Sequence, residues 1–403
     1  MANILFIYPR KMVTAEDMYN IFTSEDAIKY GMKARFVKTW EVNNELLAWA
    51  NVLIFVRNLD LLAQWILVKA CKKGLFIIQF FDDDLLGLPR SSVNRVQFLS
   101  WRKKAVKEGF NCTDLILSSN NLLAEKYSKM IPSGRFVNID TVVNPKKMIP
   151  LAKREQHYTE KEVRLVFAAG ANHEKVFEKL ITPILPKLTK ECGKKISFTF
   201  FGVHPEVTDS LAEINIEYIG AMPLLQYRKR IQEGYYDIGV APLEHNDFTQ
   251  YKYFNKFIEY TIAGCVGIYS KVPPYTLVIN DKENGFFAEN TSKSWYAALK
   301  LAIEDELLRR ECYKNAYTQI ITHMNANSIF SKFYHDIPEL TSVNQNKIKI
   351  KITGTKLKFM FVRFLECIYL VLEYIRLTGI KGAVNKIISY QKDMKNARKE
   401  NLG

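Results

Sequence analysis

The regular alternation of short apolar runs with longer helix-compatible stretches is the feature of this sequence that most limits its fold. In the first 145 residues, six such runs are rich in β-branched or aromatic side chains, and they lie at 3–8, 34–39, 52–55, 75–80, 114–118 and 135–139. Strands interleaved with helices form parallel sheets that are covered on both faces. The alternation therefore predicts an α/β domain at the start of the chain.

A second series of the same kind follows. Its strands are expected at 164–168, 197–201, 216–219, 238–241 and 265–269, and its helices at 176–188, 224–233, 256–263 and 293–325. The prediction is an α/β chain with two doubly wound, Rossmann-like domains that face a cleft, where ligands bind at the carboxyl ends of the strands. We expect an N-terminal domain at 1–150, a linker at 151–162, a second domain at 163–340 and a tail at 341–403.

The tail carries most of the positive charge of the protein. Residues 346–403 hold thirteen Lys and Arg against four Asp and Glu, a net +9 of the total +15. Within it, residues 361–375 place apolar side chains on one half of a helix and charged side chains on the other. Two hypotheses remain open: this basic amphipathic helix binds an anionic membrane leaflet, or it packs back on the N-terminal domain.

Several classes of protein are excluded by missing patterns. The sequence has no P-loop, G-x-G-x-x-G, H-E-x-x-H or G-x-S-x-G motif, and its aromatic residues are not interleaved with basic ones as in nucleic-acid-binding proteins. The six cysteines form no C-x-x-C pair, so we expect free thiols in a reducing compartment and no metal site. No run is apolar enough to span a membrane and the N-terminus does not resemble a signal peptide, which predicts a cytoplasmic or membrane-peripheral protein.

Three clusters at predicted strand ends could carry chemistry. Asp82, Asp83 and Asp84 follow the strand at 75–80, and such bunched carboxylates either face a cleft or cap the next helix. Gly170 and His173 lie in a small-residue loop between a strand and a helix, which is either an anion site or a plain turn.

The third cluster is the most informative. Lys252, Lys256 and Glu259 stand at i, i+4 and i+7, so we expect them to share one helix face. Two cations and a carboxylate suit a nucleoside diphosphate, with the lysines on phosphate and the carboxylate on ribose hydroxyls. The alternative is a solvated Lys/Glu face with an ordinary salt bridge.

The order of these pieces resembles the retaining, two-domain nucleotide-sugar glycosyltransferases of the GT-B architecture (family-4-like), over roughly residues 1–338. The resemblance rests on Ala-Gly-Ala-Asn-His-Glu at 169–174, Lys-x-x-x-Lys-x-x-Glu-Tyr at 252–260, Pro-Pro-Tyr at 273–275 and Asp-Asp-Asp-Leu at 82–85. It implies that Lys252 and Lys256 contact the donor diphosphate and Glu259 the ribose, and that Gly170 and His173 line the donor pocket. It also implies that Asp82, Asp83 and Asp84 face the acceptor, with retention and no essential metal or cofactor.

Two departures from the family pattern affect specificity. Tyr251 stands where the E-x7-E pattern has a carboxylate, and Asp247 or Glu244 are the candidates to replace it in contacting the sugar. The usual glycine-rich loop after the first strand is replaced by Tyr-Pro-Arg-Lys at 8–11, and residues 1–150 contain no histidine.

We therefore expect a glycosyltransferase that moves a hexose-like sugar from a nucleotide-sugar donor to a glycan or lipid-linked acceptor in surface polysaccharide synthesis. It would work in the cytoplasm as a peripheral protein on the inner face of the membrane, with no nucleic-acid partner. The alternatives are a non-catalytic nucleotide-sugar or glycan-binding module and a nucleotide-sugar epimerase.

Overall fold

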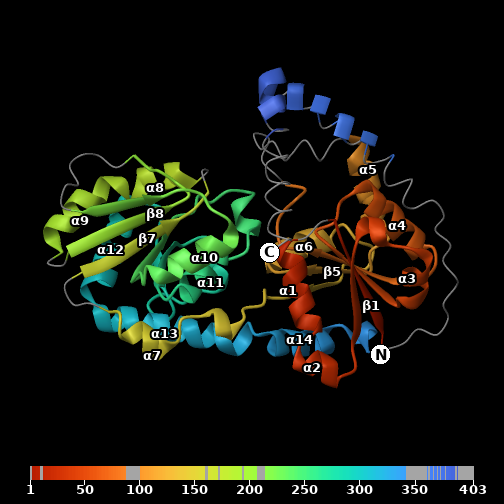
Figure 1. Ribbon diagram of the computed structural model, residues 1–403, viewed down its shortest axis with the longest axis horizontal. Helices are drawn as coiled ribbons and strands as arrows, with labels where there is room; N and C mark the ends of the chain where they lie inside the picture. Colours follow the sequence, from red (N-terminus) through yellow and green to blue (C-terminus); the bar gives the residue numbers. More distant parts are fainter. Residues whose placement is uncertain are drawn as a thin grey trace. The chain divides into compact units, whose positions relative to one another are not determined.

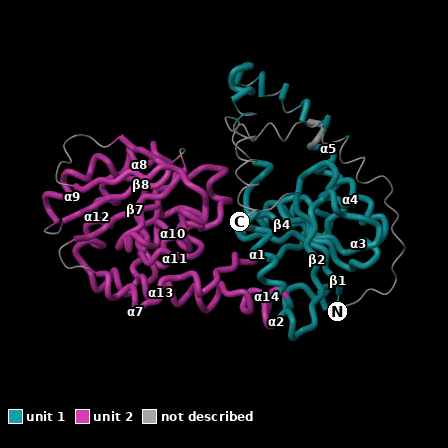
Figure 2. The backbone as a smooth tube through the Cα atoms, in the orientation of Figure 1, with its two compact units in different colours: residues 1–23, 27–138, 334–403 teal, residues 24–26, 139–333 magenta. Residues whose placement is uncertain are grey.

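The computed structural model contains two compact units, each built on one parallel sheet. It describes residues 2–9, 12–87, 100–158, 162–170, 173–192, 195–206 and 214–341, and most residues between 361 and 388. Unit 1 comprises residues 1–23, 27–138 and 334–403, and unit 2 comprises residues 24–26 and 139–333 (Figures 1 and 2). Each unit is described here by itself.

Unit 1 follows the predicted alternation closely. Its elements are β1 (Asn3–Tyr8), α1 (Val13–Phe22), α2 (Glu25–Lys29, shared with unit 2), β2 (Lys33–Lys38), η1 (Thr39–Glu41), α3 (Asn44–Trp49), β3 (Val52–Val56), α4 (Leu61–Cys71), β4 (Phe76–Phe81), α5 (Ser100–Asn111), β5 (Leu115–Ser118), α6 (Asn121–Ser128) and β6 (Phe136–Asn138). The six strands are parallel, in the order β2-β1-β3-β4-β5-β6.

Unit 2 repeats this architecture. Its elements are η3 (Pro145–Lys147), α7 (Leu151–Glu155), β7 (Glu162–Ala168), α8 (Glu174–Leu180), η5 (Thr182–Ile184), α9 (Leu185–Glu191), β8 (Lys195–Phe201), β9 (Asn215–Ile219), α10 (Leu224–Glu233), β10 (Ile238–Ala241), η7 (Thr249–Tyr251), α11 (Asn255–Ile262), β11 (Val266–Ser270), η8 (Tyr275–Leu277), β12 (Phe286–Ala288), α12 (Ser292–Glu304) and α13 (Glu306–His323). The strand order is β12-β11-β10-β7-β8-β9, again all parallel.

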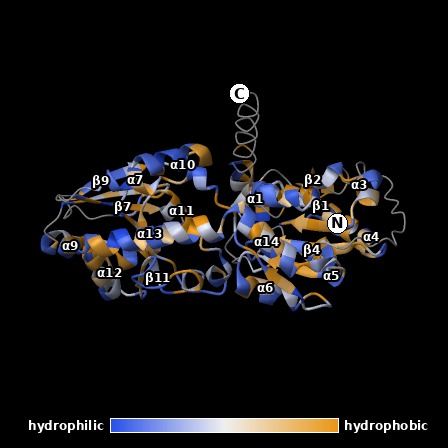
Figure 3. Cartoon of the chain, turned by 90° about the horizontal axis from the view of Figure 1, so that it is seen from below, coloured by the Kyte–Doolittle hydropathy of each residue, from blue (hydrophilic) through white to orange (hydrophobic). Residues whose placement is uncertain are grey.

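The central strands of both sheets are buried on their two faces, as a doubly wound fold requires, whereas the edge strands β2 and β9 are partly exposed. Alternate residues of β7 point to opposite sides: Leu165 and Phe167 pack in one apolar cluster with α8, α9 and α12, whereas Val166 and Ala168 pack in another with α10 and α11. In unit 1, β1 and β4 are drawn as hydrophobic ribbons (Figure 3). The predicted fold class of two Rossmann-like α/β domains is confirmed.

Two of the predicted helices are each interrupted. Residues 176–188 form α8, η5 and α9, because Pro183 and Pro186 cannot donate the backbone hydrogen bonds that one continuous helix needs. Residues 293–325 form α12 and α13, which meet at Asp305, where the carboxylate accepts a hydrogen bond from the Leu308 amide and caps α13. The short strand β12 was not predicted.

The unit boundaries also differ from the predicted domain limits. The described residues of the expected linker at 151–162 belong to unit 2, because Arg154 of α7 is fully buried in that unit. At the other end, α14 (Ala326–Asp336) begins in unit 2 and ends in unit 1, and η9 (Pro338–Leu340) follows it there.

The tail is described only in part. The described residues between 361 and 388 are helical, whereas 342–360 and 389–403 lie outside the described residues. Of the helices that the structure describes, none combines the length and apolar character needed to span a membrane.

Candidate functional site

The second sheet has a topological switch point between β7 and β10. The chain runs outward from β7 through β8 and β9, and it then returns to place β10 on the other side of β7. Loops that leave two such neighbouring strands diverge, and the crevice between them is the usual ligand site of an open α/β sheet. The loop after β7 contains Gly170 and His173, and the loop after β10 leads to Lys252 and Lys256.

His173 brings these loops together. Its side chain is half-buried immediately before α8, and burial lowers its pKa to about 4, with the positive charges of Lys252 and Lys256 adding to the effect. The charges of these two lysines, which follow β10, therefore act on His173, which follows β7. A neutral imidazole beside two ammonium groups, close to the start of a helix, provides hydrogen bonds and positive charge for an anionic ligand.

Gly170 leaves room beside this group. It is exposed at the carboxyl end of β7, and a Cβ atom built on it would meet no other atom within 4 Å. The space next to the backbone is therefore open to a ligand.

Lys252 does not lie on the same helix face as Lys256 and Glu259, which corrects the sequence prediction. α11 begins only at Asn255, and Lys252 has extended backbone (φ −68°, ψ 158°) at the end of η7. The preceding loop is stabilised by the Thr249 hydroxyl, which donates a hydrogen bond of 2.6 Å to the Glu244 carbonyl. This loop also contains Asp247, which is exposed, and Tyr251, which is half-buried.

Lys256 and Glu259 form an ion pair one helical turn apart, with side chains 26% and 25% exposed. The charge of Glu259 contributes, after burial, to raising the pKa values of Tyr227 and Tyr275. The carboxylate thus lies among buried phenol groups and differs from the solvated Lys/Glu face that was the alternative. A ligand that binds Lys256 in place of Glu259 must therefore also offer hydrogen-bond donors to the Glu259 carboxylate.

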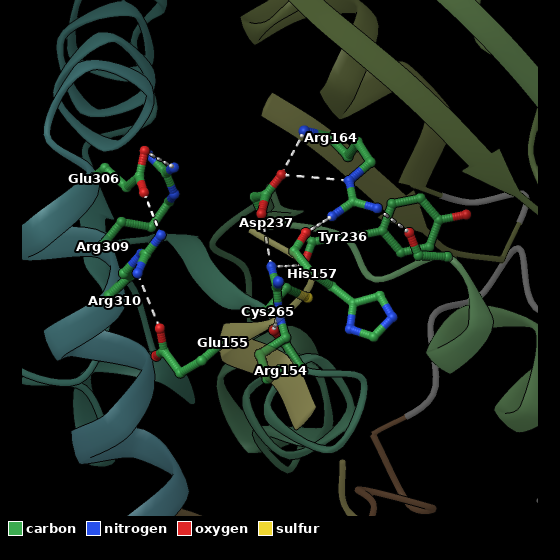
Figure 4. A network of polar contacts seen from close by, with 12 residues as sticks. Arg154, Glu155, His157, Arg164, Tyr236, Asp237, Cys265, Glu306, Arg309 and Arg310 are labelled. Carbon is green, nitrogen blue, oxygen red and sulfur yellow. Dashed lines mark hydrogen bonds and ion pairs between the residues drawn. The ribbon is translucent and has the colours of Figure 1, made fainter. Parts of the chain in front are cut away.

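A buried polar network holds the other end of α11 (Figure 4). The Arg154 side chain donates to the Gly264 carbonyl (2.5 Å), the Tyr236 carbonyl (2.9 Å) and the Asp237 carboxylate (2.6 Å). Gly264 has a φ of +87°, which a glycine adopts readily and which ends the helix. Asp237 also accepts from the Arg164 amide (2.8 Å), so the network joins α7, β7, β10 and the end of α11.

The three consecutive aspartates that follow β4, Asp82, Asp83 and Asp84, have two different environments. Asp82 is ion-paired with Arg57 (3.0 Å) and accepts a hydrogen bond from the Thr14 hydroxyl (2.7 Å), and Asp83 lies 3.6 Å from Arg57. Both follow β4 at the carboxyl edge of the sheet.

Asp84 is different because it is fully buried. It accepts hydrogen bonds from the Lys126 ammonium (2.6 Å), the Tyr127 hydroxyl (2.9 Å) and the Gly87 amide (3.1 Å). These contacts give it a structural environment and remove it from the surface at which an acceptor would bind.

The sequence patterns did not predict that Arg57 and Thr14 belong to this group. Arg57 follows β3 directly and has a φ of +46°, which is uncommon for a residue with a side chain. Its position at a strand end, next to Asn58 and Asp60, was the available signal. Thr14, in the first turn of α1, gave no signal. Within the described part of the chain, no three His, Cys, Asp or Glu side chains gather as a metal site would require.

Comparisons with known proteins place the fold. No family model and no curated protein matches this sequence. Among solved structures, Anabaena HepE in complex with UDP and glucose matches with a TM-score of 0.53 at 10% identity, over 84% of this chain and 100% of that one. Sucrose-phosphate synthase from Thermosynechococcus elongatus matches with a TM-score of 0.55 at 10% identity, over 84% and 99%. The chain has the GT-B glycosyltransferase fold.

A glycosyltransferase from Rickettsia africae matches at 12% identity with a TM-score of 0.53, over 86% of this chain and 100% of that one. At these identities the likeness shows the fold alone.

Proposed function

We propose that this protein is a retaining, metal-independent glycosyltransferase that moves a hexose-like sugar from a nucleotide-sugar donor to a glycan or lipid-linked acceptor in surface polysaccharide synthesis. The observation that carries the proposal is the convergence of His173, Lys252 and Lys256 at the switch point of the second sheet. Support comes from fold relatives such as HepE, which was solved with UDP-glucose. The lipopolysaccharide outer core galactosyltransferase WaaB, at 12% identity and a TM-score of 0.50, is a further relative, and it covers 83% of this chain and 99% of its own.

The residues have the following roles in this proposal. Lys252 and Lys256 bind the donor diphosphate and stabilise the charge that develops on it as the sugar leaves. Glu259 accepts hydrogen bonds from the ribose hydroxyls, and Gly170 and His173 line the pocket. Neutral His173 can donate to a phosphate or sugar oxygen without holding its own charge.

The acceptor would meet the carboxyl edge of the first sheet, with Asp82 and Asp83 as the groups that orient its hydroxyl. Attack on the face from which the diphosphate leaves retains the configuration, and the leaving phosphate takes the acceptor proton. Asp247 and Tyr251 lie in the loop after β10, where they can contact the sugar.

The central experiment is a panel of nucleotide sugars with mass detection of products. Transfer to an acceptor, with the anomeric configuration of the donor kept and with no loss of rate in EDTA, is the expected result. A protein that binds one donor but neither hydrolyses nor transfers it would instead be a binding module, and epimer formation without an acceptor would identify an epimerase.

Substitutions at α11 test the donor site. Lys256→Ala and Glu259→Ala each remove a charge-assisted contact worth about 1.5–3 kcal/mol, so donor affinity should fall roughly tenfold to over a hundredfold. Lys229→Ala is the matched control, because Lys229 forms an exposed pair with Glu233 on the neighbouring helix α10. Donor binding by calorimetry that is equal in all four proteins would contradict the site.

The tail supports a second part of the proposal, binding to an anionic membrane leaflet. Phe361, Phe364, Leu365, Ile368, Val371 and Leu372 are between 37% and 63% exposed, and they lie within one face of a helix. Ile380, Val384 and Ile388 continue the exposed apolar positions at helical spacing. Combined with a net charge of +9 over residues 346–403, this surface matches an anionic bilayer, to which each nearby Lys or Arg contributes about 1 kcal/mol.

Vesicle sedimentation tests this part. The protein should sediment with vesicles that contain anionic lipid and remain in solution with neutral ones, and Phe364→Glu/Leu372→Glu should abolish sedimentation. Leu225→Glu/Leu307→Glu is the control, because it adds the same charge at exposed apolar positions outside the tail. A chain that ends at Thr341 and still sediments, or equal sedimentation with neutral vesicles, would refute it.

A further inference from the structure

Two cysteines lie at the ends of the neighbouring helices α4 and α5, far in the sequence from the donor-site residues at 170–259. Cys71 is the last residue of α4, and Cys112 follows directly after α5. Burial, and then the nearby Cys71, raise the pKa of the Cys112 thiol, and both side chains pack against the same apolar cluster of unit 1. Both are half-buried, whereas Cys192, Cys265 and Cys312 are buried and Cys367 is exposed.

The packing of the two helices keeps this pair in place. Gly109 of α5 faces Gln64 of α4, and a Cβ atom at Gly109 would overlap the Gln64 side-chain oxygen. Gln64 in turn donates a hydrogen bond of 3.1 Å to the Asn58 carbonyl, which precedes α4. The absence of a side chain at Gly109 therefore lets α5 pack closely against Gln64 of α4, with the two thiols at the ends of these helices.

We propose that Cys71 and Cys112 are an oxidation site that closes to an intramolecular disulfide on exposure to a small-molecule disulfide such as oxidised glutathione. In the first step the Cys71 sulfur attacks one sulfur of the reagent, forms a mixed disulfide and releases one glutathione thiolate. In the second step the Cys112 sulfur attacks the Cys71 sulfur, loses its proton to solvent and releases the second glutathione. Two protein thiols are oxidised and one glutathione disulfide is reduced to two thiols.

The environment of Cys112 sets the order of these steps. Burial and the neighbouring Cys71 raise the pKa of Cys112 to about 12, so this group remains a thiol at neutral pH. The thiolate is the attacking species in exchange, so a raised pKa disfavours Cys112 as the first group to attack the reagent. Cys112 then attacks from its place in the same apolar cluster as Cys71, and the second step is intramolecular.

Closing this bond would restrain a long loop of the unfolded chain. The segment between Cys71 and Cys112 includes β4, with the aspartates that follow it, and α5. Restricting the unfolded state of such a loop stabilises the folded protein. We expect the Tm of the oxidised protein to rise by several degrees and to return to its original value on reduction.

The test is peptide mapping of the full-length protein after incubation with a glutathione buffer of defined redox potential. Trypsin cuts at Lys69, Lys72, Lys107 and Lys126, so the expected product is the peptide 70–72 linked to 108–126, with the loss of two of the six titratable thiols. Cys71→Ser and Cys112→Ser should each abolish the linked peptide and the rise in Tm, whereas Cys367→Ser should change neither.

Two results would overturn the inference. One is a wild-type protein in which Cys71 carries glutathione or stays reduced while Cys112 remains a thiol in the most oxidising buffer. The other is a linked peptide that involves a different cysteine. Both readouts are independent of glycosyl transfer, so their failure and that of the proposed function are distinguishable.

Discussion

At the scale of single residues, His173 shows how burial, with neighbouring positive charges adding to it, sets a protonation state. Its imidazole has a pKa of about 4, whereas the same group in an unfolded chain has a pKa near 6.5. Between these values the unfolded chain binds more protons than the folded one. The contribution of the neutral imidazole to stability is therefore complete above about pH 6.5 and is lost as the pH falls toward 4.

Replacing His173 with Asn should flatten this dependence. Each unit of pKa difference corresponds to about 1.4 kcal/mol, which solvent screening reduces at a half-buried position. Urea unfolding of unit 2 at pH 4.5 and pH 7 measures the change, and the difference between the two pH values should be smaller in the variant. An identical difference in variant and wild type would show that His173 does not titrate as described.

The aspartates that follow β4 should respond unequally to substitution. Asp84→Asn removes the buried carboxylate that accepts hydrogen bonds from Lys126 and Tyr127, and the loss of a charge-assisted hydrogen bond costs roughly 2 kcal/mol. Asp83→Asn, at a side chain that is 37% exposed, should change stability little but reduce transfer to the acceptor. Denaturant unfolding and transfer assays on both variants check this, and equal losses of stability would contradict it.

At the scale of elements, the sequence predicted the strands well and the helix ends poorly. A buried parallel strand such as β3 is a continuous apolar run with few alternatives, so its limits are visible in the sequence. The start of α11 is not, because the turn at Thr249 that precedes it depends on hydrogen bonds between a side chain and the backbone. Lys252 was therefore assigned to the helix, and its place with His173 in a donor site, which the resemblance implies, stays a prediction.

The end of α11 provides a prediction at this scale. Gly264→Ala should destabilise unit 2, because φ is +87° and the new Cβ would lie 3.0 Å from the Ile149 side chain and 3.1 Å from Arg154. Gly134→Ala isolates the backbone contribution, since Gly134 also has a positive φ but no atom lies within 4 Å of its Cβ position. Thermal unfolding should show a larger loss for Gly264→Ala, and equal losses would mean that the Arg154 contact is not tight.

At the scale of the whole molecule, unit 1 is assembled from both ends of the chain. The Ala2 amide donates a hydrogen bond of 3.1 Å to the Leu340 carbonyl, and Arg135 pairs with Glu339 at 2.6 Å. Tyr30 contacts Tyr334 with ring centroids 4.6 Å apart. The alternation of strands predicted unit 1 but not this return of the chain, because residues 337–341, the described segment directly after α14, contain no strand that a sequence pattern could reveal.

Shortening the chain tests the contribution of this return. A protein that ends at Phe333 lacks Tyr334, Glu339 and Leu340, so unit 1 should unfold at a lower temperature than in a protein that ends at Thr341. Unit 2 should unfold alike in both, because its last residue is Phe333. Calorimetry resolves the transitions, and identical scans of the two proteins would show that the returning segment adds nothing to unit 1.

The same return sets an order of events during translation. The ribosome releases the chain from the N-terminus, so the first strand of unit 1 emerges early, while Leu340, which pairs with Ala2, emerges only after all of unit 2. Unit 2 is a nearly contiguous stretch and can complete its core as soon as Phe333 is free. Unit 1, whose strands are made first, is thus completed only after unit 2.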